Sequence, residues 1–182
     1  MKILVILIIL VVVLILFLYS YYGGFSKFKI LTKITGGEII VFETHIGDYK
    51  KSGEVSDKIY YSLLNDEKIE TYKGIGIYYD NPKKTETEKL RSEIGCILEE
   101  SDYDKIETLK EKYGIKKIEE KEYITSEFPF KGKLSILFGI LKVIPALNEY
   151  AKENNYDEDS PIMEIYDVPN KKILYRKEII KK

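Results

Sequence analysis

Histidine and cysteine, the usual ligands of zinc, are scarce in this sequence, and their scarcity limits the kinds of site that the chain can form. The 182 residues include one histidine, His45, and one cysteine, Cys96. These counts exclude an internal disulfide and any zinc site that needs two histidines or several cysteines. Carboxylates near phenols are a further possibility, and Glu164 and Tyr166, two residues apart, are one such pair. Aromatic faces attract organic cations and a buried carboxylate supplies the opposite charge, so this pair is a candidate for a ligand site.

The place of this pair depends on the strand that carries it. In a strand over 161–167, successive side chains point to opposite faces of a sheet. A small two-layer domain buries one sheet face against its helices, and we expect Met163 and Ile165 on that face. Glu164 and Tyr166 would then lie on the open face, in a groove. In the alternative interpretation, Glu164 is an ordinary open-face residue in solvent.

Other polar residues predict structure more readily than catalysis. No Gly-x-Ser-x-Gly segment accompanies His45, so we expect this histidine to shape the start of a helix. Cys96 lies among alternating apolar residues, which is typical of a core position. Gly74-Ile75-Gly76 lacks the third glycine of a dinucleotide loop, and the sequence contains no Gly-Lys-Ser/Thr phosphate loop. We therefore expect no cofactor and no metal.

The N-terminus is the most apolar part of the sequence. Residues 3–18 are sixteen consecutive Ile, Leu, Val or Phe. With the following residues to Tyr22 they would form a helix about 30 Å long, enough to cross a membrane. The tyrosines would lie at the membrane interface, and Gly23-Gly24 would end the helix. We expect a transmembrane anchor over 1–22, with residues 3–22 in the membrane; a cleaved signal peptide and a buried core helix are the alternatives.

The distribution of charged residues indicates which partners the chain would bind and which side of a membrane its C-terminal domain would face. The 29 Lys and Arg nearly balance the 30 Asp and Glu, for a net charge of −1, so no nucleic-acid partner is expected. Lys27, Lys29 and Lys33 follow the anchor, and the positive-inside rule favours a cytoplasmic C-terminal domain. In a bacterium, however, a short N-terminal tail often stays inside, which would reverse this orientation.

The rest of the chain is expected to form one mixed α/β domain over 36–182, after a linker and first strand over 23–35. Runs of β-branched and aromatic residues predict strands near 38–44, 74–80, 91–99, 161–167 and 173–177, and one long strand or a strand pair over 115–128. Apolar residues at helical spacing, together with turn residues, predict helices over 47–64, 102–113 and 134–153.

The domain contains an internal repeat. Asp80 and Asp167 end similar tyrosine-containing segments 87 residues apart, and Gly47 and Gly132 precede the two longest predicted helices of the domain, 85 residues apart. We therefore expect two strand-helix-strand-strand modules, over about 36–100 and 115–180.

The repeat extends the candidate site. If Asp80 is aligned with Asp167, Ile77 and Tyr79 take the places of Glu164 and Tyr166. The junction between the modules would then be a groove with aromatic walls and a carboxylate floor, suited to an organic cation.

Five short motifs, in this order along the chain, resemble the GyrI-like small-molecule-binding domain, which also forms the effector-binding half of several multidrug-sensing regulators. They are His45-Ile46-Gly47-Asp48-Tyr49, Gly76-Ile77-Tyr78-Tyr79-Asp80-Asn81-Pro82, Leu90-Arg91-Ser92-Glu93-Ile94-Gly95, Phe128-Pro129-Phe130-Lys131-Gly132 and Met163-Glu164-Ile165-Tyr166. The resemblance implies an α+β fold of tandem strand-helix-strand-strand modules, with helices on one face of an antiparallel sheet and a pseudo-two-fold axis.

The resemblance also bears on the site. In the multidrug-sensing relatives a Glu in the last motif faces the ligand, and Glu164 matches it. Tyr49 belongs to the first motif and joins the candidate ligand residues. Some family members hydrolyse reactive electrophiles with a pocket Glu and aromatic neighbours, so in an enzyme Glu164 and Tyr166 would be the catalytic pair. We expect a binding module, with the hydrolase as the alternative.

A membrane helix ahead of such a domain is similar to the testis-expressed ER-phagy receptor family. That similarity implies a membrane-tethered adaptor or receptor that binds a protein segment, which is our second alternative. The expected protein is a single-pass, membrane-anchored module for amphipathic or cationic organic ligands.

Overall fold

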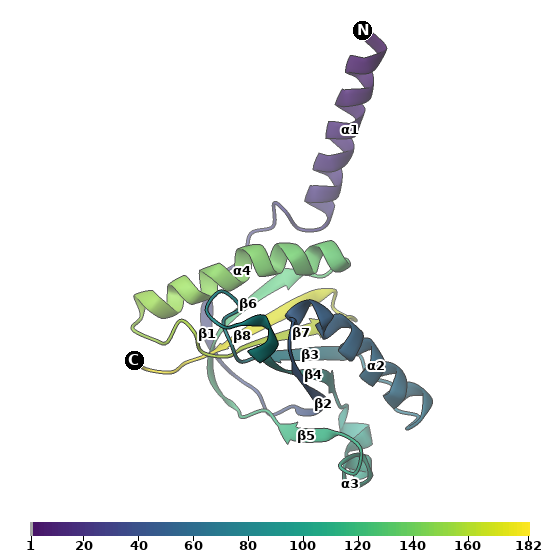
Figure 1. Ribbon diagram of the computed structural model, residues 1–182, viewed down its shortest axis with the longest axis vertical. Coiled ribbons are helices and arrows are strands. Elements are labelled where there is room, and N and C mark those ends of the chain that lie inside the picture. The colour runs from purple at the N-terminus through teal and green to yellow at the C-terminus, as the bar shows by residue number, and fades with distance from the viewer. Residues whose placement is uncertain (1) are drawn as a thin grey trace.

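The computed structural model describes residues 2–182 and begins with a helix that stands apart from the rest of the chain. α1 (Lys2–Tyr21) has no buried residue, and its 20 residues are about 30 Å long at 1.5 Å per residue. Figure 1 shows α1 projecting away from the domain. Gly23 follows with a φ of +95°, a backbone conformation that favours a residue without a Cβ. The predicted N-terminal apolar helix is confirmed.

The remaining residues form an eight-stranded sheet with helices on it. The elements are β1 (Leu31–Thr35), β2 (Ile39–Ile46), α2 (Ser52–Asn65), β3 (Lys73–Tyr78), β4 (Arg91–Ile97), α3 (Ile106–Leu109), β5 (Gly114–Lys117), β6 (Lys121–Pro129), α4 (Lys133–Glu153), β7 (Ile162–Asp167) and β8 (Lys172–Glu178). Short 3-10 turns precede α2, β4 and α3.

The order of strands in the sheet shows the tandem arrangement. It is β1-β6-β8-β7-β3-β4-β2-β5, and every neighbouring pair is antiparallel. The sequences β2-α2-β3-β4 and β6-α4-β7-β8 repeat one pattern, and they meet where β3 pairs with β7. Gly47 and Gly132, which precede the two main helices, have similar positive φ values of +131° and +126°. The predicted α+β class with an antiparallel sheet is confirmed.

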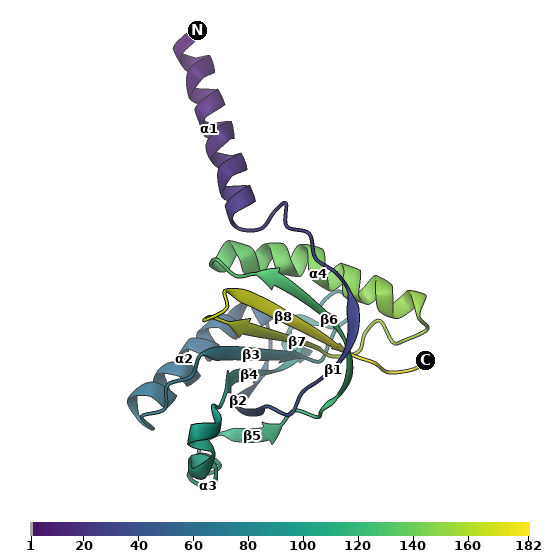
Figure 2. The same cartoon turned by 180° about the vertical axis from the view of Figure 1, so that it is seen from behind.

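α2 and α4 lie on the same face of the sheet, which Figures 1 and 2 show from opposite sides. Ile59 of α2 is buried against Val41 of β2. Val143 of α4 is buried in a cluster with Phe128 of β6. Each helix therefore covers the strands of its own module, and the centre of the sheet lies between them.

The face of the sheet away from the helices is closed, contrary to our expectation of an open face. Strand residues from both modules form a buried apolar cluster there, and Ile118 of the β5–β6 connection and Tyr123 of β6 belong to it. The segment before β2 lies beside the β5–β6 connection, where the Gly37 amide donates to the Ile118 carbonyl (2.9 Å). The β5–β6 connection, with Ile118 in this cluster, therefore helps to cover the second face of the sheet.

The segment 115–128, predicted as one long strand or a strand pair, is a pair of strands, β5 and β6, because residues 118–120 cross the second face of the sheet. One predicted helix is divided in the structure. The helix predicted over 102–113 is a 3-10 turn, Glu100–Lys105, followed by the short α3.

α1 and α4 are both long and apolar enough to cross a membrane, by length and composition alone. They differ in burial. α4 buries a stripe of small and apolar residues on the sheet: Ser135, Gly139, Val143, Leu147 and Ala151. α1 buries none. α4 is thus part of the folded domain, whereas α1 contacts the domain at its C-terminal end, where the Tyr19 ring packs against Phe138.

Candidate functional site

Glu164 lies near the middle of the sheet, on the face that the helices cover. In β7, Met163 and Ile165 pack in the cluster on the other face, whereas Tyr166 packs with residues under α4. Strand alternation places Glu164 on the side of Tyr166. Our expectation that Met163 and Ile165 face the helices is therefore wrong. Both faces of this strand are buried, so alternation of polar and apolar residues could not identify the helix-covered face.

The strand neighbours of Glu164 are Gly76 in β3 and Tyr175 in β8. Gly76 has no side chain, and Tyr78 lies over it: a Cβ on Gly76 would be 2.8 Å from Tyr78 Oη. Tyr175 has no exposed surface, and its Oη occupies the place that a Cβ on Gly139 of α4 would need. Glu164 is therefore enclosed by the sheet, by tyrosine side chains and by α4, and is 2% exposed.

Tyr166 and Tyr49 extend this aromatic surround. Tyr166 Oη donates a hydrogen bond to Glu164 Oε2, and its ring lies 5.7 Å from that of Phe130. Tyr49 begins the 3-10 turn before α2 and packs edge-on against Tyr78 at 4.9 Å. The name tyrosine site is used below for Glu164 together with Tyr49, Tyr78, Tyr166 and Tyr175.

The electrostatics of the tyrosine site follow from burial. Burial raises the pKa of Glu164 to about 7, and the hydrogen bond from Tyr166 acts in the opposite direction. Among residues 2–182, the partner of this carboxyl is that hydroxyl and not a Lys or Arg. Burial also raises the pKa of Tyr78, Tyr166 and Tyr175, and the Glu164 charge adds to the effect. Near neutral pH the phenols of the site are protonated, and its carboxyl is more readily protonated than an exposed Glu.

The structure brings together three of the five predicted site residues: Glu164, Tyr166 and Tyr49. Ile77 and Tyr79 lie on the opposite face of the sheet. Ile77 is buried in the cluster of that face. Tyr79 packs against the same cluster, and its Oη accepts a hydrogen bond from Lys116 Nζ (2.8 Å).

The parity of the repeat explains this placement. Gly76 is the strand partner of Glu164 and precedes it by 88 residues. Because side chains alternate along each strand, a β3 residue lies on the same face as a β7 residue only when their residue numbers differ by an even number. The alignment of Asp80 with Asp167 has an odd offset, and a slip of one residue moves a side chain to the other face. Tyr78, and not Tyr79, is the β3 tyrosine on the face of Glu164.

Sequence reasoning omitted Tyr78 and Tyr175. A signal for Tyr78 is present in the sequence: Gly74 and Gly76 leave one face of β3 bare, and a neighbouring large side chain can cover it. Tyr175 carries no comparable signal, because its contact with Gly139 depends on how α4 crosses β8.

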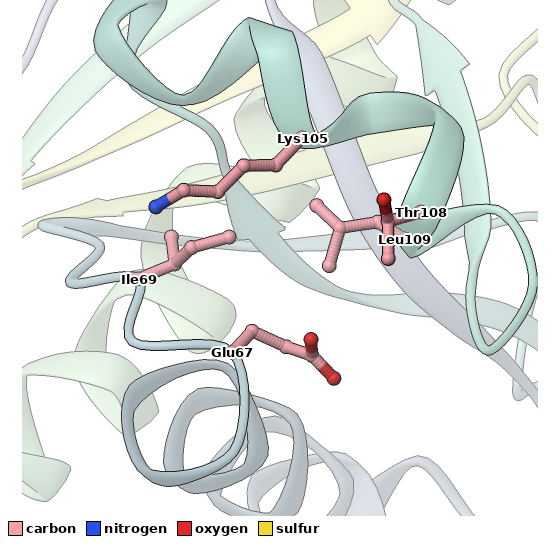
Figure 3. Close-up of a pocket in the computed structure, with 5 residues that line it drawn as sticks. All are labelled: Glu67, Ile69, Lys105, Thr108 and Leu109. Atoms are coloured by element: carbon pink, nitrogen blue, oxygen red, sulfur yellow. The ribbon is translucent and has the colours of Figure 1, made fainter.

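Two small cavities lie away from the tyrosine site. Figure 3 shows one, about 200 Å³, between the end of α2 and α3. Ile69 and Leu109 line its apolar part, and Glu67 and Lys105 lie at its edge. Each of those two charges already forms an ion pair at 2.7 Å with another side chain, so this cavity offers little unpaired charge to a ligand. The second cavity, about 340 Å³, lies beside β1.

His45 and Cys96 lie outside the tyrosine site. His45 Nε2 is 3.2 Å from the carbonyl oxygen of Asp48, at the start of the helical segment before α2. Cys96 is buried under α2, and burial raises the pKa of its thiol. Within residues 2–182, no three His, Cys, Asp or Glu side chains gather where they could hold a metal ion.

Comparison with known families and proteins gives a consistent match. Residues 61–180 match the model of the GyrI-like small molecule binding domain, which covers more than half of the chain. Testis-expressed protein 264 of Homo sapiens is 31% identical over 133 residues, or 70% of this chain, and its Mus musculus homolog is 30% identical over the same length. The chain spans about two fifths of the length of these relatives, 40% and 41%.

Solved structures share the fold at low sequence identity. The C-terminal domain of EcmrR superposes with a TM-score of 0.57 at 8% identity, covering 85% of this chain and 99% of that one. SAV2435 bound to tetraphenylphosphonium superposes with a TM-score of 0.55 at 11% identity, covering 85% and 94%. A Vibrio cholerae integron cassette protein gives 0.53 at 14% identity, covering 85% and 96%.

Proposed function

The chain belongs to the GyrI-like family of small-molecule-binding domains, and we propose that it is a membrane-tethered member that binds small organic cations at the tyrosine site. Glu164 supplies the negative charge and the tyrosine rings supply the walls. One observation carries the proposal: a carboxyl that is 2% exposed has a phenol as its hydrogen-bond partner in place of a basic side chain.

A buried carboxyl without a positive partner is costly to ionise, because the protein interior solvates charge poorly. The raised pKa of Glu164 is the consequence of that cost. A cationic ligand would remove the cost by pairing with the carboxylate. The site is therefore suited to positive charge, and it would disfavour an anion.

The aromatic residues support the same ligand class. A cation within about 6 Å of an aromatic ring gains about 0.5–2 kcal/mol, and more when water is excluded. Tyr78, Tyr166 and Tyr175 all come from strands that flank or carry Glu164. Their phenols also remain protonated near neutral pH, and the phenol of Tyr166 donates a hydrogen bond to the carboxylate.

The tyrosine side chains themselves fill the site. Tyr78 lies over Gly76, and Tyr166 is bonded to the carboxyl. A ligand must therefore displace at least Tyr166 before it can reach Glu164. SAV2435 has a similar fold and was solved with tetraphenylphosphonium, which supports trying this lipophilic cation as the first probe.

α1 is the proposed tether. Its twenty residues are exposed on every side and include no acidic residue in the first turn and no basic residue in the last. An isolated helix of this composition is stable in a bilayer and would aggregate in water. We place the domain on the cytoplasmic side, because Lys27, Lys29 and Lys33 follow the helix.

Hydrolysis of reactive electrophiles is the second candidate, and one observation favours it. A carboxyl with a pKa of about 7 beside a phenol is suited to general acid–base catalysis at neutral pH. An enzyme would lose turnover in Glu164→Gln far more than it loses substrate affinity. A binding module would show only the loss of affinity.

The test of the proposed function is calorimetry of the full chain in detergent micelles with tetraphenylphosphonium. We expect saturable binding at one site per chain. Absence of binding by the wild-type chain, or equal binding by wild type and Glu164→Gln, would overturn the assignment to the tyrosine site.

A further inference from the structure

The N-terminal half of α4 carries an apolar surface that the domain does not cover. Leu134, Leu137, Ile140 and Leu141 are 43%, 47%, 42% and 62% exposed. Their spacing places them together on the face of the helix opposite the buried stripe. The outer face of a helix on a globular domain is normally polar, so a group of four exposed aliphatic residues indicates a contact with another apolar phase.

This surface lies at the foot of α1. Figures 1 and 2 both show α4 crossing the domain directly below the end of α1, with the two helices crosswise to one another. The Tyr19 ring of α1 packs edge-on against Phe138 of α4 at 5.0 Å and against Phe25 at 4.8 Å. Phe25 is itself 64% exposed and extends the apolar surface toward the anchor.

The segment between the two helices is fixed to α4 by hydrogen bonds. Ser135 Oγ donates to the Tyr22 carbonyl at 3.0 Å. Lys142 Nζ donates to the carbonyls of Gly24 (2.7 Å) and Ser26 (3.0 Å). These bonds hold α4 close to the point where the apolar length of α1 ends.

Positive charge borders the same surface. Lys131 and Lys133 stand exposed at the beginning of α4, and Lys27 and Lys29 stand exposed in the segment after α1. Lys131 Nζ also lies 4.7 Å from the centre of the Tyr21 ring. An apolar helix face with lysines at its border is the pattern of a helix that lies in the interface of a bilayer with anionic lipids.

We infer that the outer face of α4, formed by Leu134, Leu137, Ile140 and Leu141, docks on the membrane that α1 crosses. The inference rests on the anchor in the proposed function. The bilayer is the occupant because the surface continues the apolar surface of α1 at the level where the anchor emerges. The side chains would lie at the boundary between headgroups and acyl chains, with the lysines among the headgroups. Because the inner face of α4 meets Tyr175 at Gly139, docking would place the tyrosine site one helix away from the lipid.

A fluorescence experiment tests the inference directly, because the chain has no tryptophan. Three variants of the full chain each carry one tryptophan: Leu137→Trp on α4, Leu10→Trp in the anchor and Tyr61→Trp on α2. Tyr61 is the matched control, since it is 56% exposed on a helix and Leu137 is 47% exposed. Each variant is reconstituted into vesicles of phosphatidylcholine and phosphatidylglycerol, with the phosphatidylcholine either unmodified or brominated.

We expect bromines near the headgroup end of the acyl chain to quench the fluorescence of Leu137→Trp. Bromines near the bilayer centre should quench Leu10→Trp most. Tyr61→Trp should keep its emission with either position of the bromines. Quenching of Leu10→Trp without quenching of Leu137→Trp overturns the docking of α4 and leaves the anchor standing. Quenching of Leu137→Trp alone overturns the anchor and leaves α4 as a surface contact. If neither is quenched, both are wrong. Leu137 is largely exposed, so the substitution leaves the core unchanged, and near-wild-type thermal unfolding checks this.

Discussion

Tyr166 Oη donates its hydrogen bond to Glu164 Oε2 from two residues away on the same face of β7. The phenol of Tyr166 therefore occupies the carboxyl with which a cationic ligand would have to pair. Tyr166 stabilises the ionised carboxyl, while burial opposes ionisation and has the larger effect. A cation that replaces the phenol as the partner of Glu164 would exchange a hydrogen bond from a neutral donor for a pairing of opposite charges.

Glu164→Gln should weaken binding of tetraphenylphosphonium by about 1–3 kcal/mol, or roughly 5- to 150-fold, because the substitution keeps the shape of the side chain and removes its charge. Triphenylphosphine oxide, a neutral aromatic compound, is the control and should bind both chains nearly equally. Calorimetry measures both affinities. Equal weakening of the two ligands would show that the substitution damages the site as a whole and that charge recognition is not its basis.

Binding of tetraphenylphosphonium should strengthen as pH rises through about 7, the pKa to which burial raises Glu164. Below that pH the cation must first displace a proton, so affinity should fall by roughly tenfold for each further pH unit. Fluorescence or calorimetric titrations from pH 5 to about 8 measure this slope. Glu164→Gln should bind weakly at every pH, and a slope that survives in this variant would assign the titration to another group.

Stability should depend on pH in the opposite direction to binding. The pKa of Glu164 is raised from 4.5 to about 7 on folding, so the folded chain binds a proton more tightly than the unfolded chain. Its contribution to stability is therefore fully present below about pH 4.5 and is lost as pH rises toward 7. Thermal unfolding of the full chain in micelles should show this loss, and it should be smaller in Glu164→Gln. A difference between the two chains that does not change with pH would contradict the burial of Glu164.

The sequence predicted the elements and their order better than the faces of the strands. Residues with strong local signals, such as the β-branched run of β2 and the apolar spacing of α4, are placed correctly within a few residues. The predicted orientation of Glu164 was wrong because side chains on both faces of β7 are buried. Local alternation separates two faces, but only the tertiary fold decides which of them meets the helices.

The residues of the tyrosine site were predictable only in part, because some of its contacts are local in the sequence and others are not. Glu164 and Tyr166 share a strand, so their common face follows from local geometry alone. Tyr78 requires the register between β3 and β7, and Tyr175 requires the crossing of α4 over β8. Both are contacts between segments far apart in the sequence, which periodicity in a single segment cannot supply.

Gly139→Ala should destabilise the domain by about 1–3 kcal/mol, because the new Cβ would occupy the place of Tyr175 Oη. Tyr175→Phe alone should be nearly neutral or stabilising, since that buried Oη has no hydrogen-bond partner among residues 2–182. The double variant should recover most of the lost stability. Urea unfolding of the four chains measures the coupling, and strictly additive effects would contradict the contact between α4 and β8.

The anchor prediction separates α1 from the surface contact of α4. The full chain should stay in the membrane fraction after extraction with alkaline carbonate, which strips proteins held by charge or by shallow contacts. A chain that begins at Lys27 keeps the outer face of α4 but lacks the exposed helix of twenty residues. It should associate with anionic vesicles at neutral pH and low salt, and should leave them in carbonate or at high salt, because only the interfacial contact remains.

Membrane retention is measured by sedimentation and immunoblotting, and N-terminal sequencing of the retained chain is the control. A mature N-terminus near Lys27 would identify residues 2–22 as a cleaved signal peptide and would remove the anchor from the proposed function.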